Sequence, residues 1–509
     1  MDVFARRRAG VLLHPTSLPG SLGNGDLGPD AYRFVDLLVD CRITLWQTLP
    51  LGPTHEDLSP YQCLSVHAGD FRLINLQLLV EQGWLDDAGL DPSQDPDVQR
   101  RLRLAAAHDG FQRQASAEER EAFARFACEH AGWLEDFALY QALRGAHRGK
   151  AWYQWPRAIC DRQPAALARE RTRLAQQIEQ VRFEQFLFYR QWKQLRRYAN
   201  ERGVLLFGDI PIFVAHDSAD VWAHREWFSV NAHGQSQVVA GVPPDYFSAT
   251  GQRWGNPHYH WDALQQDGYR WWVERIRSQM EMFDLVRIDH FRGFEAYWEI
   301  DAQAETAVDG RWVKGPGDSF FQALTAELGE LPLVAEDLGV ITPEVTALRE
   351  RFGLPGMKIL QFAFDGSPDN PYLPHNHETL SVVYTGTHDN DTTAGWFRGN
   401  GDDTRTAEEI ESTRANALKF TGGKAQTIAR DMIRLAFSTR AVMAVAPMQD
   451  YLGLGSRARL NTPGTTLNNW RWRLERDELT SGSTWHAAAN IHGLHDVTNI
   501  SRLQHYTMT

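Results

Sequence analysis

An aspartate follows a short apolar run in the stretch FDLVRIDHFRGF, residues 283–294. Asp289 stands at the end of that run, Arg287 precedes it by two residues and His290 follows it. A single aspartate in such a place is more often a helix N-cap or an arginine partner than a catalyst. A nearby arginine, Arg287 or Arg292, could instead keep the carboxylate ionised for chemistry.

The same arrangement recurs after three other apolar runs, which end in Asp209, Glu336 and Asp389. Carboxylates crowded into one partly desolvated place repel one another, so a purely structural use of four would be wasteful. Glycoside cleavage, by contrast, needs an ionised carboxylate beside a protonated carboxyl group. His290 and His388 could hydrogen-bond sugar hydroxyl groups, or could be ordinary histidines at strand ends.

Eight short apolar segments that end in polar residues, glycine or proline indicate strands buried on both faces of a parallel sheet. Helix-like stretches lie between many of them, at 263–283 and 342–353 for instance. This alternation predicts an α/β fold, and the count of eight favours a (β/α)8 TIM barrel over an open doubly wound sheet. An open sheet would also be expected to carry GxGxxG after its first strand, which HPTSLPGSLGNG lacks. The predicted strands are 10–17, 44–52, 204–213, 285–291, 333–339, 357–364, 381–391 and 441–450.

We expect one catalytic barrel domain over residues 1–509 with two insertions. About 150 residues separate the second and third predicted strands, far more than one crossover helix requires. Residues 62–200 have helical spacing and many helix formers, so they predict a mainly helical inserted subdomain. Residues 218–262 are expected to form an inserted substrate-loop region. Since catalytic groups of barrels stand at the carboxyl ends of strands, the four acids should converge on one mouth.

Aromatic residues suggest what the mouth binds. The chain has 18 tryptophans, and several aromatic residues fall in stretches expected to be loops at the mouth. An aromatic side chain is usually part of a core. One in a loop rich in glycine and proline, such as GVPPDYFSATGQRWGNP at 241–257, can instead stack on the apolar face of a sugar ring. The residues concerned are Trp222, Trp227, Trp254, Trp396, Tyr246 and Phe247.

Charge and cysteine content argue against several other classes of protein. A formal net charge of −13 repels polyanions and acidic membranes, so nucleic acid and membranes are not expected partners. No apolar run approaches the roughly 18 residues of a membrane span, and MDVFARRRAGVLLHP lacks a signal-peptide core. The four cysteines lie far apart without CxxC spacing, which favours a reducing cytoplasm.

Two other chemistries are less favoured. The HDND run at 388–391 could ligate a metal ion, but there is no second cluster with ligand spacing. No GxSxG elbow appears, which argues against a serine hydrolase. We therefore expect neither a metal nor a cofactor.

Nearly the whole chain resembles the 4-α-glucanotransferases, also called amylomaltases or disproportionating enzymes, of glycoside hydrolase family 77 in the α-amylase superfamily. The stretches GVPPDYFS and RARLNTPG separate that family from ordinary amylases. The resemblance also rests on HPTSLPG, PLGPT, SPYQ, GDIPIFV, VRIDHFRGF, AEDLG, GTHDNDT and LGLGSRARLNTPGT.

The resemblance implies retaining transfer of α-1,4-glucan segments from maltooligosaccharides or starch to glucose or glucan acceptors, through a covalent glucosyl-enzyme. It implies Asp289 as the nucleophile, Glu336 as the general acid and base, and Asp389 as the carboxylate that stabilises the transition state. The substrate-binding positions that it implies are Tyr61, Asp209, Tyr246, Phe247, Trp254, Arg287, His290, His388 and Asn390.

Two alternatives remain open at the level of sequence. An amylase-type hydrolase would use the same acids but deliver the intermediate to water. A non-catalytic glucan-binding protein would not need Glu336 and Asp389 together, and the complete acid set argues against it.

Overall fold

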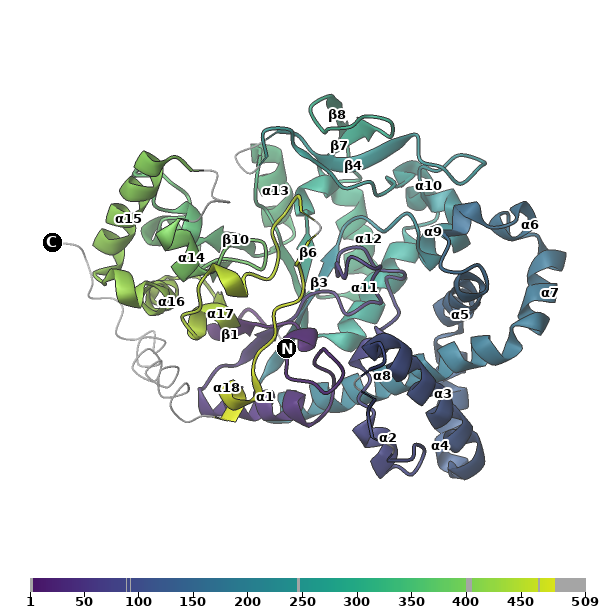
Figure 1. The fold of residues 1–509 in the computed structure, drawn as a ribbon. Coiled ribbons are helices and arrows are strands. Elements are labelled where there is room, and N and C mark those ends of the chain that lie inside the picture. Colours follow the sequence, from purple (N-terminus) through teal and green to yellow (C-terminus); the bar gives the residue numbers. More distant parts are fainter. Residues whose placement is uncertain are drawn as a thin grey trace.

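The computed structural model describes residues 3–87, 89–91, 93–244, 248–399, 405–465 and 467–480. Its centre is a sheet of eight parallel strands in the order β10-β11-β12-β1-β2-β3-β6-β9 (Figure 1). All eight predicted strands are present, which confirms the barrel. Their bounds are β1 (Arg8–Leu12), β2 (Leu45–Gln47), β3 (Leu205–Pro211), β6 (Leu285–Asp289), β9 (Leu333–Ala335), β10 (Gly356–Ile359), β11 (Ser381–Tyr384) and β12 (Met443–Pro447).

The sheet curls until its edge strands β9 and β10 approach each other. At this seam the backbone N–H of Ala335 donates to the carbonyl of Pro355 at 2.8 Å. The N–H of Met357 donates to Oδ1 of Asp337 at 2.7 Å, and Nε of Arg349 lies 3.2 Å from Oδ2 of the same carboxylate. A side chain therefore supplements the backbone hydrogen bonds that close the barrel.

Side-chain alternation along the strands sorts apolar residues into two layers. In β6, Val286 and Ile288 belong to the core between the barrel and its helices, whereas Leu285 belongs to the cluster that fills the barrel. Arg287 and Asp289 follow Leu285 by two and four residues, so they lie on the same face of the strand. They therefore face inward and toward the mouth. The sequence LVRID thus places its charged pair on one face of the strand.

Helices surround the barrel, and those between β2 and β3 gather on one side of it (Figure 1). Among the described residues that segment contains α2 (Gln77–Glu81), α3 (Pro96–Gln114), α4 (Ala117–Glu129), α5 (Ala131–Ala146), α6 (Arg157–Cys160), α7 (Pro164–Arg173) and α8 (Ala175–Glu201). The other helices are α1 (Pro29–Asp40), α9 (Ala219–Ala223), α10 (Trp261–Gln266), α11 (Arg270–Met282), α12 (Asp318–Leu328), α13 (Pro343–Arg351), α14 (Thr393–Arg398), α15 (Ala407–Thr421), α16 (Ile428–Ser438), α17 (Met448–Tyr451) and α18 (Arg476–Thr480).

Local sequence signals explain several helix ends. The Asp95 side chain caps α3 by accepting from two backbone N–H groups, and Pro96 occupies its first turn. Ser116 and Glu119 form a capping box at the start of α4. The helix expected over 263–283 is instead split into α10 and α11, because Gly268 and Tyr269 adopt left-handed φ values of 68° and 55°.

A second sheet, which the sequence analysis did not predict, lies above the barrel in Figure 1. Its four antiparallel strands have the order β5-β4-β7-β8. It is built mostly from the segments on either side of α10, α11 and β6. Its strands are β4 (Val238–Val242), β5 (Gln252–Arg253), β7 (Ala296–Asp301) and β8 (Gly310–Lys314).

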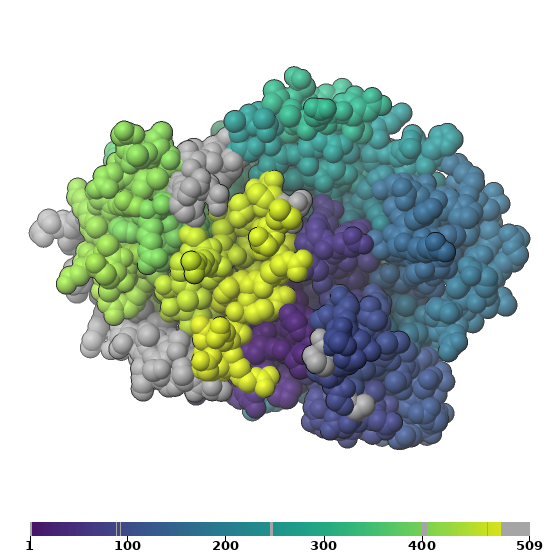
Figure 2. Space-filling model, viewed as in Figure 1, coloured from purple at the N-terminus to yellow at the C-terminus, as the bar shows by residue number. Residues whose placement is uncertain are grey.

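The segment after α17 returns to the start of the chain. The backbone N–H of Leu474 donates to the carbonyl of Ser17 at 2.8 Å. Figure 2 shows this segment, in yellow, beside the amino-terminal residues in purple. Within the described residues, no helix is long and apolar enough to cross a membrane.

Candidate active site

Arg287 is the centre of a buried ionic cluster at the mouth of the barrel. Its Nε donates to Oδ1 of Asp209 at 3.0 Å, and its Nη2 lies 2.8 Å from Oδ2 of the same residue. The same Nη2 donates to Oδ1 of Asp289 at 2.8 Å. Parallel pairing of β3 with β6 sets Asp209 directly beside Arg287, so the register of the sheet creates the cluster.

Glu336 lies beside Asp289 because β9 pairs with β6 in register. Ile288 is paired with Ala335, and the next residues along the two strands are the two acids. One carboxylate oxygen of Glu336 accepts from the N–H of His290 at 2.6 Å, and the other accepts from the N–H of Leu338 at 3.0 Å. The carboxyl group is therefore fixed by backbone donors on both oxygens.

Burial gives the two acids different tendencies to hold a proton. It raises the pKa of Glu336 to about 7, although Arg287 and the N–H of His290 oppose the shift. Burial also raises the pKa of Asp289, but Arg287 opposes this through a direct hydrogen bond. The side chain of Asp289 also remains 30% exposed. The pKa of each acid is raised, and the direct contact with Arg287 favours the ionised form of Asp289.

Asp389 follows β11 and reaches the mouth from another side of the barrel. Its Oδ1 accepts from Nδ2 of Asn461 at 2.6 Å and lies 3.3 Å from Nε2 of His388. Nη2 of Arg459 donates to its backbone carbonyl at 2.7 Å. The carboxylate is 47% exposed, so it can meet a ligand without losing these partners.

Tyr61 joins the two sides of the site. Its hydroxyl group donates to Oδ2 of Asp209 at 2.7 Å and accepts from Nη2 of Arg287 at 3.1 Å. Its ring stacks on His388 with 5.2 Å between centroids and 15° between planes. Asp209, Arg287, Asp289, Tyr61, His388 and Asp389 thus form one continuous cluster.

Trp254, which follows β5 of the second sheet, contacts His290, which follows barrel strand β6. The rings of Trp254 and His290 meet edge to face at 4.8 Å. Nε2 of His290 is buried and has no protein partner, so it can serve a polar ligand. Burial lowers the pKa of His290 to about 3, so this ring is neutral. Tyr246 and Phe247 lie outside the described residues.

Three expectations about individual residues are wrong. Trp222 is fully buried in α9, where its ring packs on Tyr140 and Trp155, because α9 turns its apolar side toward the helical insert. Trp396 is buried in α14. The contacts of Arg292 include no hydrogen bond or ion pair with Asp289, Glu336 or Asp389, and its guanidinium stacks instead on Trp312, at 3.7 Å from the ring centroid.

Asn390 is next to Asp389 in the sequence, but its side chain bonds to a residue of its own turn. Its Oδ1 accepts from both the N–H and the hydroxyl of Thr387 at 2.9 Å, which shapes the turn after β11. This turn presents His388 and Asp389 to the mouth.

Three residues of the returning carboxyl-terminal segment belong to the site and were not predicted individually. Asn461 and Arg459 fix Asp389, and Trp470 lies 5.9 Å from His388 and 6.0 Å from Tyr61 between ring centroids. Arg459 and Asn461 lie in the stretch RARLNTPG, which the sequence analysis had already singled out as typical of the family. That stretch was the sequence signal that could have pointed to these two residues.

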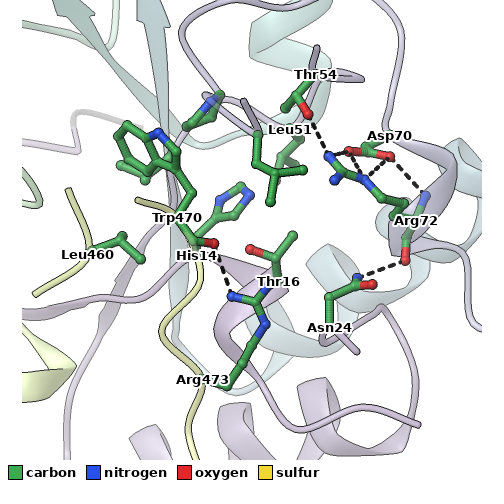
Figure 3. Close-up of a pocket in the computed structure, with 14 residues that line it drawn as sticks. His14, Thr16, Asn24, Leu51, Thr54, Asp70, Arg72, Leu460, Trp470 and Arg473 are labelled. Atoms are coloured by element: carbon green, nitrogen blue, oxygen red, sulfur yellow. Dashed lines mark hydrogen bonds and ion pairs between the residues drawn. The ribbon is translucent and has the colours of Figure 1, made fainter. Parts of the chain in front are cut away.

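A pocket continues from Trp470 past His14 (Figure 3). Arg72 lies on its wall, where Nη2 donates to the hydroxyl of Thr54 at 2.7 Å and Nε donates to Asp70. These contacts support the loop that leads to Tyr61. Among the described residues, no three histidine, cysteine, aspartate or glutamate side chains are grouped to hold a metal ion.

Comparisons with known proteins agree with this geometry. Residues 13–480 match the family model Glyco_hydro_77, described as 4-alpha-glucanotransferase. A 4-alpha-glucanotransferase of Thermus thermophilus is 50% identical over 486 residues, which are 93% of this chain and 96% of that protein. The corresponding Synechocystis protein is 46% identical over 496 residues, 94% of this chain and 96% of that protein.

Solved structures give the same result. An amylomaltase from Streptococcus agalactiae, in complex with acarbose, superimposes with a TM-score of 0.90 at 36% identity, over 97% of this chain and 99% of that one. Amylomaltase from Corynebacterium glutamicum shares the fold, with a TM-score of 0.76 at 19% identity over 95% of this chain and 75% of that one.

Proposed function

Because this chain belongs to the 4-alpha-glucanotransferases of glycoside hydrolase family 77, we propose that Asp289, Glu336 and Asp389 carry out its transfer reaction. The observation that supports this assignment best is the unequal environment of Asp289 and Glu336. Asp289 has an arginine at 2.8 Å and Glu336 has a pKa raised to about 7. One acid is prepared as a nucleophile and the other as a proton donor.

In the first step, Asp289 attacks the anomeric carbon of the sugar and forms a covalent glucosyl-enzyme. Glu336 gives its proton to the departing glycosidic oxygen. Formation of the ester removes the negative charge of Asp289, which lowers the pKa of Glu336. Glu336 is then a base that takes the proton from an acceptor hydroxyl group, and the new bond forms as Asp289 leaves.

The register of the strands supports a retaining reaction. Retention needs the two carboxyl groups about 5 to 5.5 Å apart, whereas inversion needs roughly 6.5 to 9.5 Å for an intervening water. Neighbouring strands lie about 4.7–4.9 Å apart, and the two acids follow the pair Ile288 and Ala335 in β6 and β9. This placement favours the short separation and retention of the α anomer.

Asp389 and the surrounding polar groups act on the sugar at the cleaved bond. A carboxylate held by Asn461 and exposed to the mouth can stabilise the positive charge that develops on the ring in the transition state. His290 and His388 are largely neutral because burial lowers the pKa of each, so they can exchange hydrogen bonds with sugar hydroxyl groups. Tyr61 and Asp209 position Arg287.

The substrate-loop segment around Trp254 favours transfer over hydrolysis. Water competes with the acceptor for the glucosyl-enzyme, so transfer requires a bound acceptor and exclusion of loose water. The N–H of Trp254 donates to the carbonyl of Ala240 at 3.0 Å, which anchors the indole against β4. Tyr246 and Phe247 are proposed to complete this cover.

The proposed substrates are α-1,4-glucans and maltooligosaccharides as donors, with glucose or glucan chains as acceptors. We also propose a cytoplasmic location, because all four cysteines are free of disulfide bonds. Residues 62–200 and 218–262 are proposed as insertions in a single barrel domain. The described part of each contains none of the eight barrel strands, and β3 (Leu205–Pro211) lies between the two ranges.

Incubation with maltotriose alone tests the function. Transfer gives glucose and a ladder of longer maltooligosaccharides with no net gain in reducing ends, and Asp289→Asn abolishes the conversion. A steady gain in reducing ends without a ladder would instead establish the hydrolase, and no conversion would support a binding protein.

A further inference from the structure

Trp312 on β8 is an exposed tryptophan outside the cluster of acids. Its side chain is 39% exposed. Val340, in the loop after Glu336, is 49% exposed, and Val308, just before β8, is 48% exposed. The ring of Trp298 meets that of Trp312, Val308 follows Ala307, whose carbonyl accepts from Trp298, and the carbonyl of Val340 accepts from Arg292. We call Trp312, Trp298, Val308 and Val340 the rim patch.

The indole of Trp312 is held firmly. The Arg292 guanidinium lies over its ring at 3.7 Å from the centroid, and the ring of Trp298 meets it at 5.2 Å and 65°. Trp298 is itself fixed, because its Nε1 donates to the carbonyl of Ala307 at 3.0 Å. A ring that is already ordered loses little conformational entropy when a ligand binds.

Arg292 links the rim patch to the loops that carry the candidate active site. This residue follows Asp289 by three positions in the 3-10 helix η5 (Phe291–Phe294). Its side chain is 4% exposed in total and also donates through Nη1 to the carbonyl of Val340, beyond Glu336. Arg292 thus ties the loops that follow β6 and β9 to the indole of Trp312.

The patch does not suit a protein partner. β8 is an edge strand, but its Arg311 pairs with Glu299 of β7 and its Lys314 pairs with Glu295, which directly precedes β7. Charged residues on an edge strand discourage addition of another strand. Four apolar residues are also far fewer than the roughly 20–30 residues a side of a standard protein interface.

From this arrangement we infer that Trp312 is a stacking platform for a glucose unit of the bound α-1,4-glucan, remote from the bond that is cleaved. The inference rests on the proposed function, which supplies the glucan. A sugar ring has an apolar face that matches an indole and hydroxyl groups around its edge that remain in water. The Arg292 side chain lies between the indole and the end of β6, so only a chain longer than the immediate cleavage site reaches Trp312.

Steady-state kinetics with maltotriose and maltoheptaose test this platform in three variants. Trp312→Leu keeps apolar bulk but no flat ring, Trp312→Phe keeps a flat ring, and Trp312→Ala removes both. We expect KM for maltoheptaose to rise about 3- to 10-fold for Leu and Ala, the range of one aromatic stacking contact. The Phe variant should stay near the parent. The kcat with maltoheptaose and both constants with maltotriose should not change.

Phe420→Ala is the matched control, because Phe420 is 40% exposed on α15, which Figure 1 shows on another side of the molecule. It should leave both substrates unaffected. An equal rise in KM for the two substrates, or an unchanged KM for maltoheptaose in the Leu and Ala variants, overturns the platform.

Failure of the platform and failure of the proposed function remain distinguishable. If the parent protein does not convert maltotriose, the proposed function fails. Calorimetric titration of maltoheptaose into Asp289→Asn, with and without Trp312→Leu, then still tests the platform. Weaker binding in the double variant supports it, and equal binding overturns it.

Discussion

At the scale of single residues, one guanidinium group organises the acids. Arg287 is almost fully buried and bonds to Asp209 and Asp289 at the same time through its planar fork. Lysine carries the same charge as a compact point and cannot reproduce both contacts. The orientation of Asp289 therefore depends on arginine itself and not only on positive charge.

Arg287→Lys is expected to lower kcat/KM for maltotriose by about 10²- to 10³-fold, as loss of one preorganised electrostatic contact commonly does. Circular dichroism would check that the variant is folded. Arg292→Lys is the matched control and should keep near-parent activity on maltotriose, because Arg292 makes no hydrogen bond or ion pair with the acids. Equal losses in both variants would contradict the role of Arg287.

The acid pair also predicts a pH profile. Glu336 must be protonated in the free enzyme, so kcat/KM should fall as the pH rises through about 7, the pKa that burial gives this group. Asp289 must be ionised, and burial raises its pKa. On the acidic side of the profile, kcat/KM should therefore fall with a midpoint above the ordinary aspartate pKa of about 3.9. A rate that stays constant from neutral into alkaline buffer would show that Glu336 is not the acid.

At the scale of elements, we propose that the segment 248–257 covers the site and takes no part in the chemistry. Trp254 contacts His290 edge to face, and β5 ties its neighbours to β4. We expect Trp254→Ala to let water reach the glucosyl-enzyme, so new reducing ends should rise relative to glucose transferred.

The ratio of transfer to hydrolysis is the quantity to measure, by quantifying glucose and reducing ends together. Trp133→Ala is a control of similar size, because Trp133 is a half-buried tryptophan of α5 that packs on His130 and Tyr189. Both variants lose packing, but only Trp254→Ala should change the ratio. An unchanged ratio in folded Trp254→Ala would mean that this indole does not exclude water.

The strands that form the site were predictable because they are buried on both faces and end in charged residues. The second sheet was not predicted, since β5 has only two residues and β7 is neither uniformly buried nor strictly alternating along its length. Trp222 was misplaced because the sequence of α9 does not reveal which way that short helix faces. Trp470 was missed because its contact with Tyr61 spans most of the chain, and no local pattern signals such a contact.

At the scale of the whole molecule, the barrel closes at the seam between β9 and β10. Asp337 accepts from Met357 N–H and pairs with Arg349, whose side chain is 3% exposed. Asp337→Ala should reduce the free energy of unfolding by roughly 1–3 kcal/mol, because buried donors lose their acceptor. The midpoint of urea unfolding would report the loss.

Asp318→Ala provides the comparison, since Asp318 pairs with Arg351 on the surface, where both side chains are exposed. Its effect should stay within about 0.5 kcal/mol. If both substitutions shift the midpoint equally, the seam has no special role in closing the barrel.

On the other side of β9 from this seam, β9 pairs with β6. The central claim is that this pairing makes Asp289 and Glu336 work by double displacement. Proton NMR of the linkage formed when maltotriose is both donor and acceptor tests that claim most directly. The account predicts that the first new linkage has the α configuration of the donor. A β configuration at the earliest times would mean a single displacement and would contradict the assignment of Asp289 as nucleophile.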